Sequence, residues 1–207
     1  MIPFGIDVEE FRPRDHEEDA VAALRRELEG SAILFVGAAR YYKGLDILLR
    51  AMVRVNGNLI IAGRGTDDAS LKRMAGDLGV TGKVRFYGEV SQSQLRILLH
   101  AADIFVLPSI DRCETFGIGQ LEAMACSKPI VSTDLPTGVR SVNRHGVTGL
   151  VVPPGEPVAL AQALNYLLSN PSLRAEFGES ARQRVEAEFG DDRMASKTLE
   201  VYREILG

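Results

Sequence analysis

Most of the chain alternates between short, uniformly apolar runs and amphipathic segments. The apolar runs lack the polar alternation of a strand with one solvated face, which indicates strands buried on both faces. These predicted strands cover residues 32–37, 58–63, 83–87, 104–107, 129–132 and 149–152. Strands of this kind, each followed by a helix, predict a parallel sheet that helices cover on both sides.

Helical periodicity is found between these strands, at residues 45–53, 69–78, 94–102 and again after Gly117. From Pro157 onward the pattern changes, and helices are predicted without intervening strands over 158–168, 172–188 and 194–206. The predicted fold class is therefore α/β, a Rossmann-like, doubly wound parallel sheet with a C-terminal helical tail. That tail would either cover a sheet edge or reach toward another domain.

The composition is that of an ordinary water-soluble globular protein, with 45% hydrophobic and 25% charged residues among 207. A net charge of −4 gives no electrostatic reason to expect a nucleic-acid partner. Two cysteines, Cys113 and Cys126, lack metal or redox spacing, which fits a cytoplasmic location. No apolar run reaches the roughly 20 residues of a transmembrane helix. Peripheral membrane contact stays open, although no amphipathic basic helix demands it.

The segment from Glu114 to Glu122 carries the strongest chemical signal. It follows an apolar run and passes through a glycine-containing turn into an Ala- and Met-rich helix. If the helix begins near Gly117, its free N–H groups and positive dipole end favour an anion such as a diphosphate. Hydroxyl groups are natural partners for the carboxylates, because hydroxyls donate hydrogen bonds and carboxylates only accept them. The two glutamates are candidate binders of sugar or ribose hydroxyls. Considered singly, each would more often be an ordinary surface charge.

A second cluster follows the first predicted strand, where residues 37–44 read Gly-Ala-Ala-Arg-Tyr-Tyr-Lys-Gly. These residues should meet the Glu114 segment at the carboxyl edge of the sheet. Cations there would neutralise a phosphate or a leaving group. Lys43 precedes a helix N-terminus, where a cation is unfavourable, and this favours a functional role. For Arg40, a role in the site and an ordinary place in a loop are evenly balanced.

Other polar positions give weaker signals. The Gly-Arg-Gly turn at residues 63–65 does not complete a dinucleotide-binding fingerprint, because position 68 is Asp. None of the three histidines, His16, His100 and His145, is expected to be a catalytic base. No cluster of carboxylates and histidines has metal-ligand spacing, so neither a metal nor a cofactor is expected.

An ordered series of short motifs carries a family resemblance. The motifs are Ile2-Pro-Phe-Gly-Ile-Asp7, Phe35-Val-Gly37 with Lys43-Gly44, Ile61-Ala-Gly63-x-Gly65, Val84-x-Phe86-x-Gly88, Pro108-Ser109, Glu114-x-Phe-Gly-x-x-x-x-Glu122-Ala-Met-Ala125, Lys128-Pro-Ile-Val131 and Gly146-x-Thr-Gly-Leu-x-Val-Pro153. Together they span essentially the whole chain. They strongly resemble the C-terminal half of the family-4, or group 1, retaining glycosyltransferases, which have the two-domain GT-B architecture.

The resemblance implies a Rossmann-like domain that binds a nucleotide-sugar donor without a metal. By position, Glu114 would contact hydroxyls of the donor sugar and Glu122 the nucleotide ribose. Lys43 would contact the phosphates, so Lys43 and Glu114 are the candidate catalytic residues. The segment Arg85–Phe86 would lie near the base. The full set of implied donor-binding residues is Gly37, Arg40, Lys43, Arg85, Phe86, Glu114, Phe116, Gly117, Ile118 and Glu122.

One position departs from the family pattern. Family members commonly have an arginine directly after the glycine of the first strand, whereas this chain has Ala38. Arg40 would compensate if its side chain reaches the phosphates. The alternative is a different mode of phosphate binding. The phosphate-binding residues are therefore assigned on fewer matching positions than the two glutamates.

A complete enzyme of this family should be about twice as long, judged from domain sizes. The resemblance therefore implies a connector at residues 1–14, the nucleotide-sugar-binding domain at 15–190, and a helix at 191–207 that crosses to a missing N-terminal domain. Exposed Leu199, Tyr202 or Ile205 on this helix would favour self-association. The chain alone is expected to bind nucleotide but to transfer sugar poorly, because a closed cleft is needed to exclude water.

The expected activity is transfer of a hexose-type sugar from a UDP-, GDP- or other nucleotide-linked donor to an acceptor. The alternative is a non-catalytic nucleotide-sugar-binding module, or a subunit that a partner chain completes. Retention of both glutamates does not favour an inactive copy. An epimerase of the same architecture fits less well, because Glu114-x-Phe-Gly belongs to the transferase pattern. The sequence does not fix the nucleotide, the sugar or the acceptor.

Overall fold

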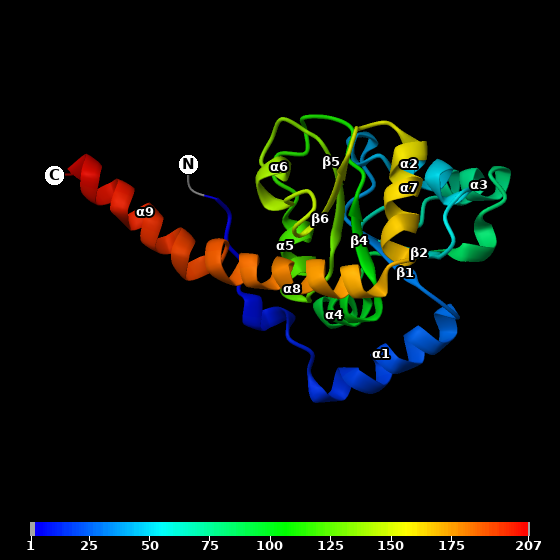
Figure 1. Cartoon of the computed structure of the whole chain (residues 1–207), viewed down its shortest axis with the longest axis horizontal. Helices are drawn as coiled ribbons and strands as arrows, with labels where there is room; N and C mark the ends of the chain where they lie inside the picture. Colours follow the sequence, from blue (N-terminus) through cyan, green and yellow to red (C-terminus); the bar gives the residue numbers. More distant parts are fainter. Residues whose placement is uncertain (1–2, 207) are drawn as a thin grey trace.

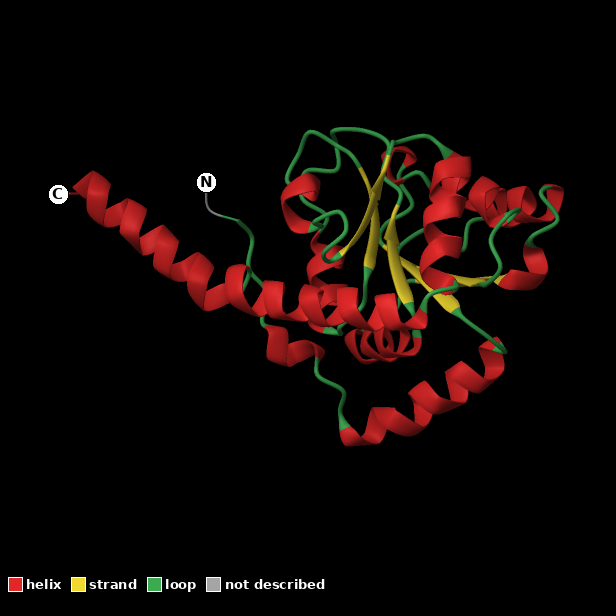
Figure 2. Ribbon diagram, viewed as in Figure 1, coloured by secondary structure: helices red, strands yellow, loops and turns green. Residues whose placement is uncertain are grey.

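A six-stranded, all-parallel sheet forms the centre of the protein (Figures 1 and 2), seen in a computed structural model that describes residues 3–206. The strand order is β3-β2-β1-β4-β5-β6. The strands are β1 (Ala32–Val36), β2 (Asn58–Ala62), β3 (Val84–Gly88), β4 (Ile104–Leu107), β5 (Ile130–Thr133) and β6 (Gly149–Val152). The predicted parallel sheet is confirmed.

Helices cover both faces of the sheet (Figure 2) because successive strand residues point to opposite sides. Ile33 and Phe35 of β1 belong to a core shared with α2 (Leu45–Met52), α3 (Ala69–Asp77) and α7 (Pro157–Leu168). The neighbouring residues Ala32 and Leu34 belong to a second core on the other face. That core includes residues of α1 (Asp15–Leu28), α4 (Gln92–Ala101), α5 (Ile118–Ala125), α6 (Val139–Val142) and α8 (Pro171–Glu188).

The helical tail is also confirmed, as α7, α8 and α9 (Asp191–Leu206) follow β6 without a further strand. Helix α9 leaves the domain and contains no buried residue (Figure 1). Leu199, Tyr202 and Ile205 are exposed by 55%, 58% and 73%. The apolar positions named from the sequence are therefore on the surface of this chain. Across residues 3–206, no helix is both long and apolar enough to cross a membrane.

Helix α1 was not predicted from the sequence. Its segment is mostly charged, and Leu24 and Leu28 are the buried apolar residues that it contributes to the core. Such a sparse apolar stripe gives little periodicity to detect. Short elements were also missed, namely α6 and the 3-10 helices Val8–Phe11, Tyr41–Lys43 and Thr81–Lys83.

A buried ion pair fixes α1 against α4. The Glu17 carboxylate accepts hydrogen bonds from the guanidinium of Arg96, at 2.6 Å from Nη2 and 3.1 Å from Nε. The Ser93 hydroxyl donates to the same carboxylate at 2.7 Å. The side chains of Glu17 and Arg96 are only 1% and 4% exposed. The hydrogen bonds from Arg96 are the main reason that the pKa of Glu17 falls from 4.5 to about 2, against the opposing effect of burial.

We expect Glu17→Gln to lower the free energy of unfolding at neutral pH by about 3 kcal/mol, because Arg96 would remain buried without a charged partner. Because the pKa of Glu17 is depressed in the folded state, its stabilising contribution is present above pH 4.5 and is lost as the pH falls toward 2. Urea unfolding measured across this range should therefore show a flatter pH dependence for the variant than for the wild type.

The matched control is Glu9→Gln, since the Glu9–Arg12 pair has side chains exposed by 62% and 58%. Removing this surface pair should change the unfolding free energy by only about 0.5 kcal/mol. Equal effects of the two substitutions would contradict the role assigned to the buried pair.

Candidate functional site

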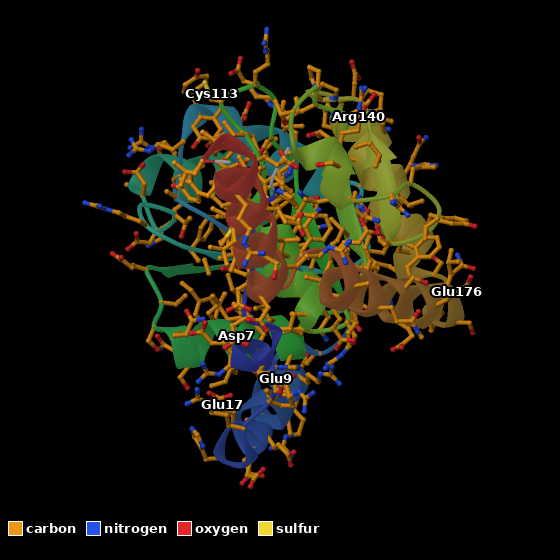
Figure 3. All side chains as sticks on the ribbon, turned by 90° about the vertical axis from the view of Figure 1, so that its left-hand side faces the viewer. Asp7, Glu9, Glu17, Cys113, Arg140 and Glu176 are labelled. Atoms are coloured by element: carbon orange, nitrogen blue, oxygen red, sulfur yellow. The ribbon has the colours of Figure 1, made fainter. Side chains whose placement is uncertain are left out.

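A crevice forms at the carboxyl edge of the sheet between β1 and β4. These two strands are neighbours, but the chain leaves β1 toward α2 on one face and leaves β4 toward α5 on the other. The loops after the two strands therefore diverge, and ligands of doubly wound folds bind at such points. Figure 3 shows Cys113, within the loop after β4, at the end of the molecule opposite Glu17.

A cavity of about 370 Å³ occupies this crevice. It brings together seven of the sequence-predicted site residues: Gly37, Lys43, Glu114, Phe116, Gly117, Ile118 and Glu122. Sequence reasoning did not assign to the site four further residues that line it: Phe4, Val36, Thr115 and Gly119. Three of them adjoin predicted positions in the chain, and proximity in the sequence would have suggested them. Phe4 comes from the segment before α1 and gave no such signal.

Lys43 and Glu114 form an ion pair inside the cavity. The Lys43 Nζ atom lies 2.6 Å from Glu114 Oε2, and the two side chains are 15% and 8% exposed. The buried Ser109 hydroxyl donates to the same oxygen at 2.9 Å. Glu114 Oε1 accepts no hydrogen bond from the described residues. One carboxylate oxygen is therefore held by the protein, and the other can accept hydrogen bonds from a ligand.

The loops carrying Lys43 and Glu114 are joined by their backbones. The Ile110 N–H donates to the Tyr42 carbonyl at 2.8 Å, across the gap between the loop after β1 and the loop after β4. Lys43 ends the 3-10 helix Tyr41–Lys43, which positions its side chain next to Gly37, the first residue after β1. The separation of the two charges is thus set by the sheet and by this hydrogen bond.

The N-terminus of α5 opens into the same cavity. Ile118 and Gly119, its first two residues, line the cavity, and N–H groups at these positions have no partner within a helix. Gly117 caps the helix in the left-handed conformation, with φ of 74°. A Cβ atom at this position would lie 2.5 Å from Leu107 Cδ2 and 2.9 Å from Gln120 Nε2. Only glycine fits this turn without strain, and the turn aims the helix dipole at the cavity.

Glu122 lies one turn into α5 and is half-buried in the cavity wall. Its side-chain carboxylate accepts no hydrogen bond from the described part of the chain. Burial raises the pKa of its carboxyl, and the negative charge of Glu10 raises it further. Glu10 belongs to the 3-10 helix Val8–Phe11, so the segment before α1 influences the ionisation of this carboxylate.

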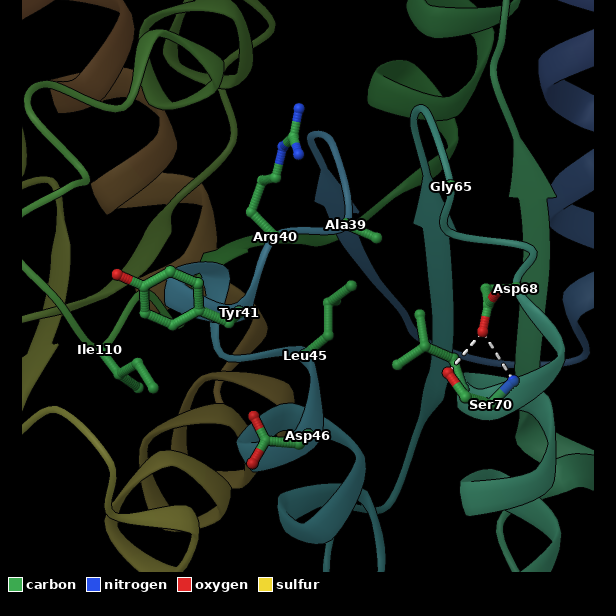
Figure 4. Close-up of a pocket in the computed structure, with 10 residues that line it drawn as sticks. Ala39, Arg40, Tyr41, Leu45, Asp46, Gly65, Asp68, Ser70 and Ile110 are labelled. Atoms are coloured by element: carbon green, nitrogen blue, oxygen red, sulfur yellow. Dashed lines mark hydrogen bonds between the residues drawn. The ribbon is translucent and has the colours of Figure 1, made fainter.

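Arg40 lines a different cavity. This space, of about 610 Å³, lies between the loops after β1 and β2 (Figure 4). Its other polar residues include Tyr41, Asp46 and Asp68, and Asp68 is engaged in capping α3 through the Ser70 N–H at 2.7 Å. Arg40 makes no ion pair among residues 3–206. Arg40 is therefore close to Lys43 along the chain but does not line the cavity that holds Lys43 and Glu114.

Arg85 and Phe86 are also outside the lining of the 370 Å³ cavity. Arg85 pairs with the carboxylate of Glu27, and its Nη2 atom donates to the Glu27 carbonyl at 2.9 Å. Phe86 packs against the core on the α2–α3–α7 face. This arrangement makes Arg85 a link between edge strand β3 and α1.

Two of the three histidines form hydrogen bonds with the backbone. His100 Nε2 lies 2.9 Å from the Phe11 carbonyl, and the Val151 N–H donates to His145 Nδ1 at 3.0 Å. Neither residue lines the 370 Å³ cavity. No group of three or more metal-ligating side chains is present within the described residues.

Comparison with known proteins agrees with this fold. The family model described as "Glycosyl transferases group 1" matches residues 17–184. The chain therefore belongs to the group 1 glycosyltransferase family, and the resemblance inferred from the motifs is confirmed. The fold is the Rossmann-like α/β half of the GT-B architecture.

Two curated relatives have names that specify a transferase. The chain is 35% identical to "O-antigen chain mannosyltransferase C" of Escherichia coli, over 100% of this chain and 54% of the relative. It is 40% identical to "D-rhamnosyltransferase WbpZ" of Pseudomonas aeruginosa, over 91% of this chain and 49% of the relative. The chain thus spans about half the length of the curated relatives it matches.

Solved structures share the fold over nearly the whole chain. Sucrose-phosphate synthase from Thermosynechococcus elongatus superposes with a TM-score of 0.86 at 29% identity, covering 99% of this chain and 52% of that one. The Anabaena protein HepE, in complex with UDP and glucose, gives a TM-score of 0.84 at 23% identity, covering 97% of this chain and 55% of that one. At 23% identity, the similarity to HepE is evidence for the fold alone.

We expect Gly117→Ala to be more destabilising than Gly79→Ala, a matched substitution. Both glycines have left-handed backbones, with φ of 74° and 69°, but a Cβ at residue 79 would meet nothing within 4 Å. The extra crowding against Leu107 and Gln120 should make the cost at residue 117 larger by about 2 kcal/mol. Urea unfolding of both variants measures this difference, and equal costs would contradict the crowding at the turn.

Proposed function

We propose that this chain is the donor-binding part of a retaining glycosyltransferase that moves a hexose-type sugar from a nucleoside diphosphate to an acceptor. The observation that carries the proposal is the Lys43–Glu114 pair beside the α5 N-terminus, in the crevice between β1 and β4. A cation and a helix dipole favour a diphosphate, and carboxylates favour hydroxyl groups. A nucleotide-sugar presents both kinds of group.

In this proposal, the diphosphate meets the N–H groups of Ile118 and Gly119 together with the ammonium of Lys43. Glu114 accepts hydrogen bonds from donor-sugar hydroxyls through the oxygen that Lys43 and Ser109 leave free. Glu122 accepts from the ribose. When the sugar leaves, negative charge grows on the diphosphate, and Lys43 and the helix N-terminus stabilise that charge. Lys43 and Glu114 are therefore the proposed catalytic residues, and this charge stabilisation uses no metal.

Gly37 would let the backbone approach the donor, because a Cβ atom at this position would lie 3.6 Å from the Lys43 Nζ atom. We propose that Arg40 contacts the donor only if its loop moves, since it does not line the cavity. We propose that the segment Arg85–Phe86 of β3 contacts a part of the donor that lies outside this cavity. The names of the relatives, a mannosyltransferase and a rhamnosyltransferase, support a hexose-type donor. UDP and GDP are both candidates for its nucleotide.

The relatives are about twice the length of this chain, and this supports a two-domain enzyme with the acceptor site largely in the other half. We propose that residues 1–14 connect the halves, that residues 15–190 bind the donor, and that α9 reaches the other half through Leu199, Tyr202 and Ile205. Without that half, the same residues would favour self-association. The unpaired cysteines Cys113 and Cys126 support a cytoplasmic setting for this reaction.

Calorimetric titration with UDP, GDP and their sugars tests the proposed donor site. We expect the wild-type chain to bind one nucleotide series, and Lys43→Ala to weaken that binding at least about tenfold through loss of a charge-assisted hydrogen bond. Glu122→Ala should weaken it similarly. Sugar transfer by the isolated chain should be slow beside its nucleotide binding.

The control is Lys72→Ala, which removes an exposed cation from α3, outside the cavity lining. Its affinity should equal that of the wild type, and melting temperatures verify that all variants are folded. Unchanged affinity in both Lys43→Ala and Glu122→Ala would refute the site. A second outcome would favour a non-catalytic binding module instead. In it, nucleotide binding depends on both residues, but a two-domain protein as long as the relatives transfers no sugar.

Nucleotide affinity should also depend on pH through Glu122. A protonated carboxyl is a poor acceptor for a ribose hydroxyl, so affinity should rise as the pH increases through the raised pKa of Glu122. Glu10→Gln removes the neighbouring negative charge and should shift the midpoint of this rise to lower pH. Titrations from about pH 4 to about pH 8 measure the midpoint. An unmoved midpoint would show that Glu10 does not act on this carboxylate.

A further inference from the structure

An aromatic ring from the connector forms one wall of the 370 Å³ cavity. Phe4 lines the cavity together with Lys43, Glu114 and Glu122, and 53% of the residue is exposed. Its ring packs edge-on against Phe116, with 5.4 Å between the ring centroids. The other walls carry charged side chains and backbone N–H groups. Phe4, Val36, Phe116 and Ile118 therefore give the cavity an apolar part beside its charged side chains.

The backbone that follows this ring is fixed by the junction of α8 and α9. The Ile6 N–H donates to the Phe189 carbonyl at 2.9 Å, and the Asp191 N–H donates to the Ile6 carbonyl at 3.2 Å. The approach is so close that a Cβ atom on Gly5 would lie 2.7 Å from the Gly190 carbonyl oxygen. Figure 1 shows the N-terminal segment passing this junction.

A second aromatic contact continues from the cavity to the same junction. Phe116 packs edge-on against Phe189, with 6.2 Å between the ring centroids. Phe4 is thus held both through its backbone, at residues 5 and 6, and through its ring, by Phe116. The exposed part of the ring is presented to the cavity in a defined position, which is how a preorganised contact surface is built.

The chemistry of the cavity indicates what this ring would contact. A diphosphate gains nothing from the face of an aromatic ring, because this face carries partial negative charge. The C–H groups of a sugar ring gain apolar contact with it while the hydroxyls on the ring edge reach carboxylates. Glu114 and Glu122 in the same cavity supply such carboxylates.

We propose that Phe4 is a further donor-binding residue, whose aromatic ring packs against the C–H face of a sugar ring of the nucleotide-sugar. The inference rests on the proposed function, since it requires a donor in this cavity. It adds that the connector is part of the donor site, and that the donor contacts a residue whose position is set by the α8–α9 junction.

Phe4→Leu tests the contact, because leucine stays apolar but has no ring face. We expect a loss of affinity for the nucleotide-sugar of about fivefold. The matched control is Tyr166→Leu, since Tyr166 is 55% exposed on α7 and lies outside the cavity lining. Its affinity should equal that of the wild type, and Phe4→Tyr should retain wild-type affinity.

Titration with the free nucleoside diphosphate distinguishes the two sugar rings of the donor. A loss confined to the nucleotide-sugar means that Phe4 contacts the transferred sugar. An equal loss with the free diphosphate means that Phe4 contacts the ribose. If the wild type binds donor and Phe4→Leu binds it equally well, the role of Phe4 is refuted while the donor site stands. If the wild type binds neither ligand, the proposed function itself fails.

A fluorescent variant gives an independent readout. The chain contains no tryptophan, so Phe4→Trp introduces a single emitter at the cavity wall. Its emission should change in a saturable way on adding the nucleotide-sugar that calorimetry identifies, with the same dissociation constant. Tyr166→Trp should show no saturable change. An unresponsive Phe4→Trp that binds donor by calorimetry would also overturn the inference.

Discussion

Burial of the central strands on both faces is the constraint on which the rest of this structure depends. Alternate residues of β1 enter two separate cores, so helices must cover both sides of the sheet. The chain satisfies this requirement by sending α2 and α5 to opposite faces from the adjacent strands β1 and β4. The crevice between their loops follows from that choice, because no helix can fill the point where the two paths diverge. The site is thus located by packing requirements before any functional side chain is considered.

Within the crevice, the Lys43–Glu114 pair resolves a conflict between burial and charge. A lone ammonium or carboxylate at this depth would carry a large desolvation cost, and pairing offsets that cost. Such a pair also gives the empty cavity a neutral centre. An arriving diphosphate would compete with Glu114 for the Lys43 ammonium, and hydroxyl groups would replace Lys43 as hydrogen-bond donors to the carboxylate. A nucleotide-sugar carries both the diphosphate and the hydroxyl groups in one molecule.

The sequence predicted those elements whose buried side chains form a clear apolar pattern along the chain. All six strands are completely or largely apolar runs, and each was located to within a few residues. Helix α1 escaped because its attachment depends on the polar pair Glu17–Arg96, whose partners are about 80 positions apart and leave no local pattern. The candidate site followed the same rule. Residues of the 114–122 segment could be placed together because a single turn holds them.

Side chains that are directed by distant contacts could not be placed from the sequence. Arg40 follows Gly37 closely in the chain, yet the path of the loop turns it into the neighbouring cavity. Arg85 was expected near the nucleotide base, and its pairing with a carboxylate on α1, an element that was itself missed, could not be foreseen from the sequence. Both cases depend on tertiary contacts between segments whose relative placement only the folded chain defines.

Phe4 is the clearest case of such dependence, and it changes how the domain should be divided. A connector is ordinarily treated as a tether that can be cut away from a binding domain. Here residues 5 and 6 pair with the α8–α9 junction, and the adjacent ring reaches the cavity that holds Lys43 and Glu114. Burial raises the pKa of Glu122 in that cavity, and the charge of Glu10, further along the same segment, raises it further. The cavity is therefore lined by the sheet edge and by the segment before α1 together, and any shift of this segment against α8 and α9 would alter both the apolar wall of the cavity and its electrostatics.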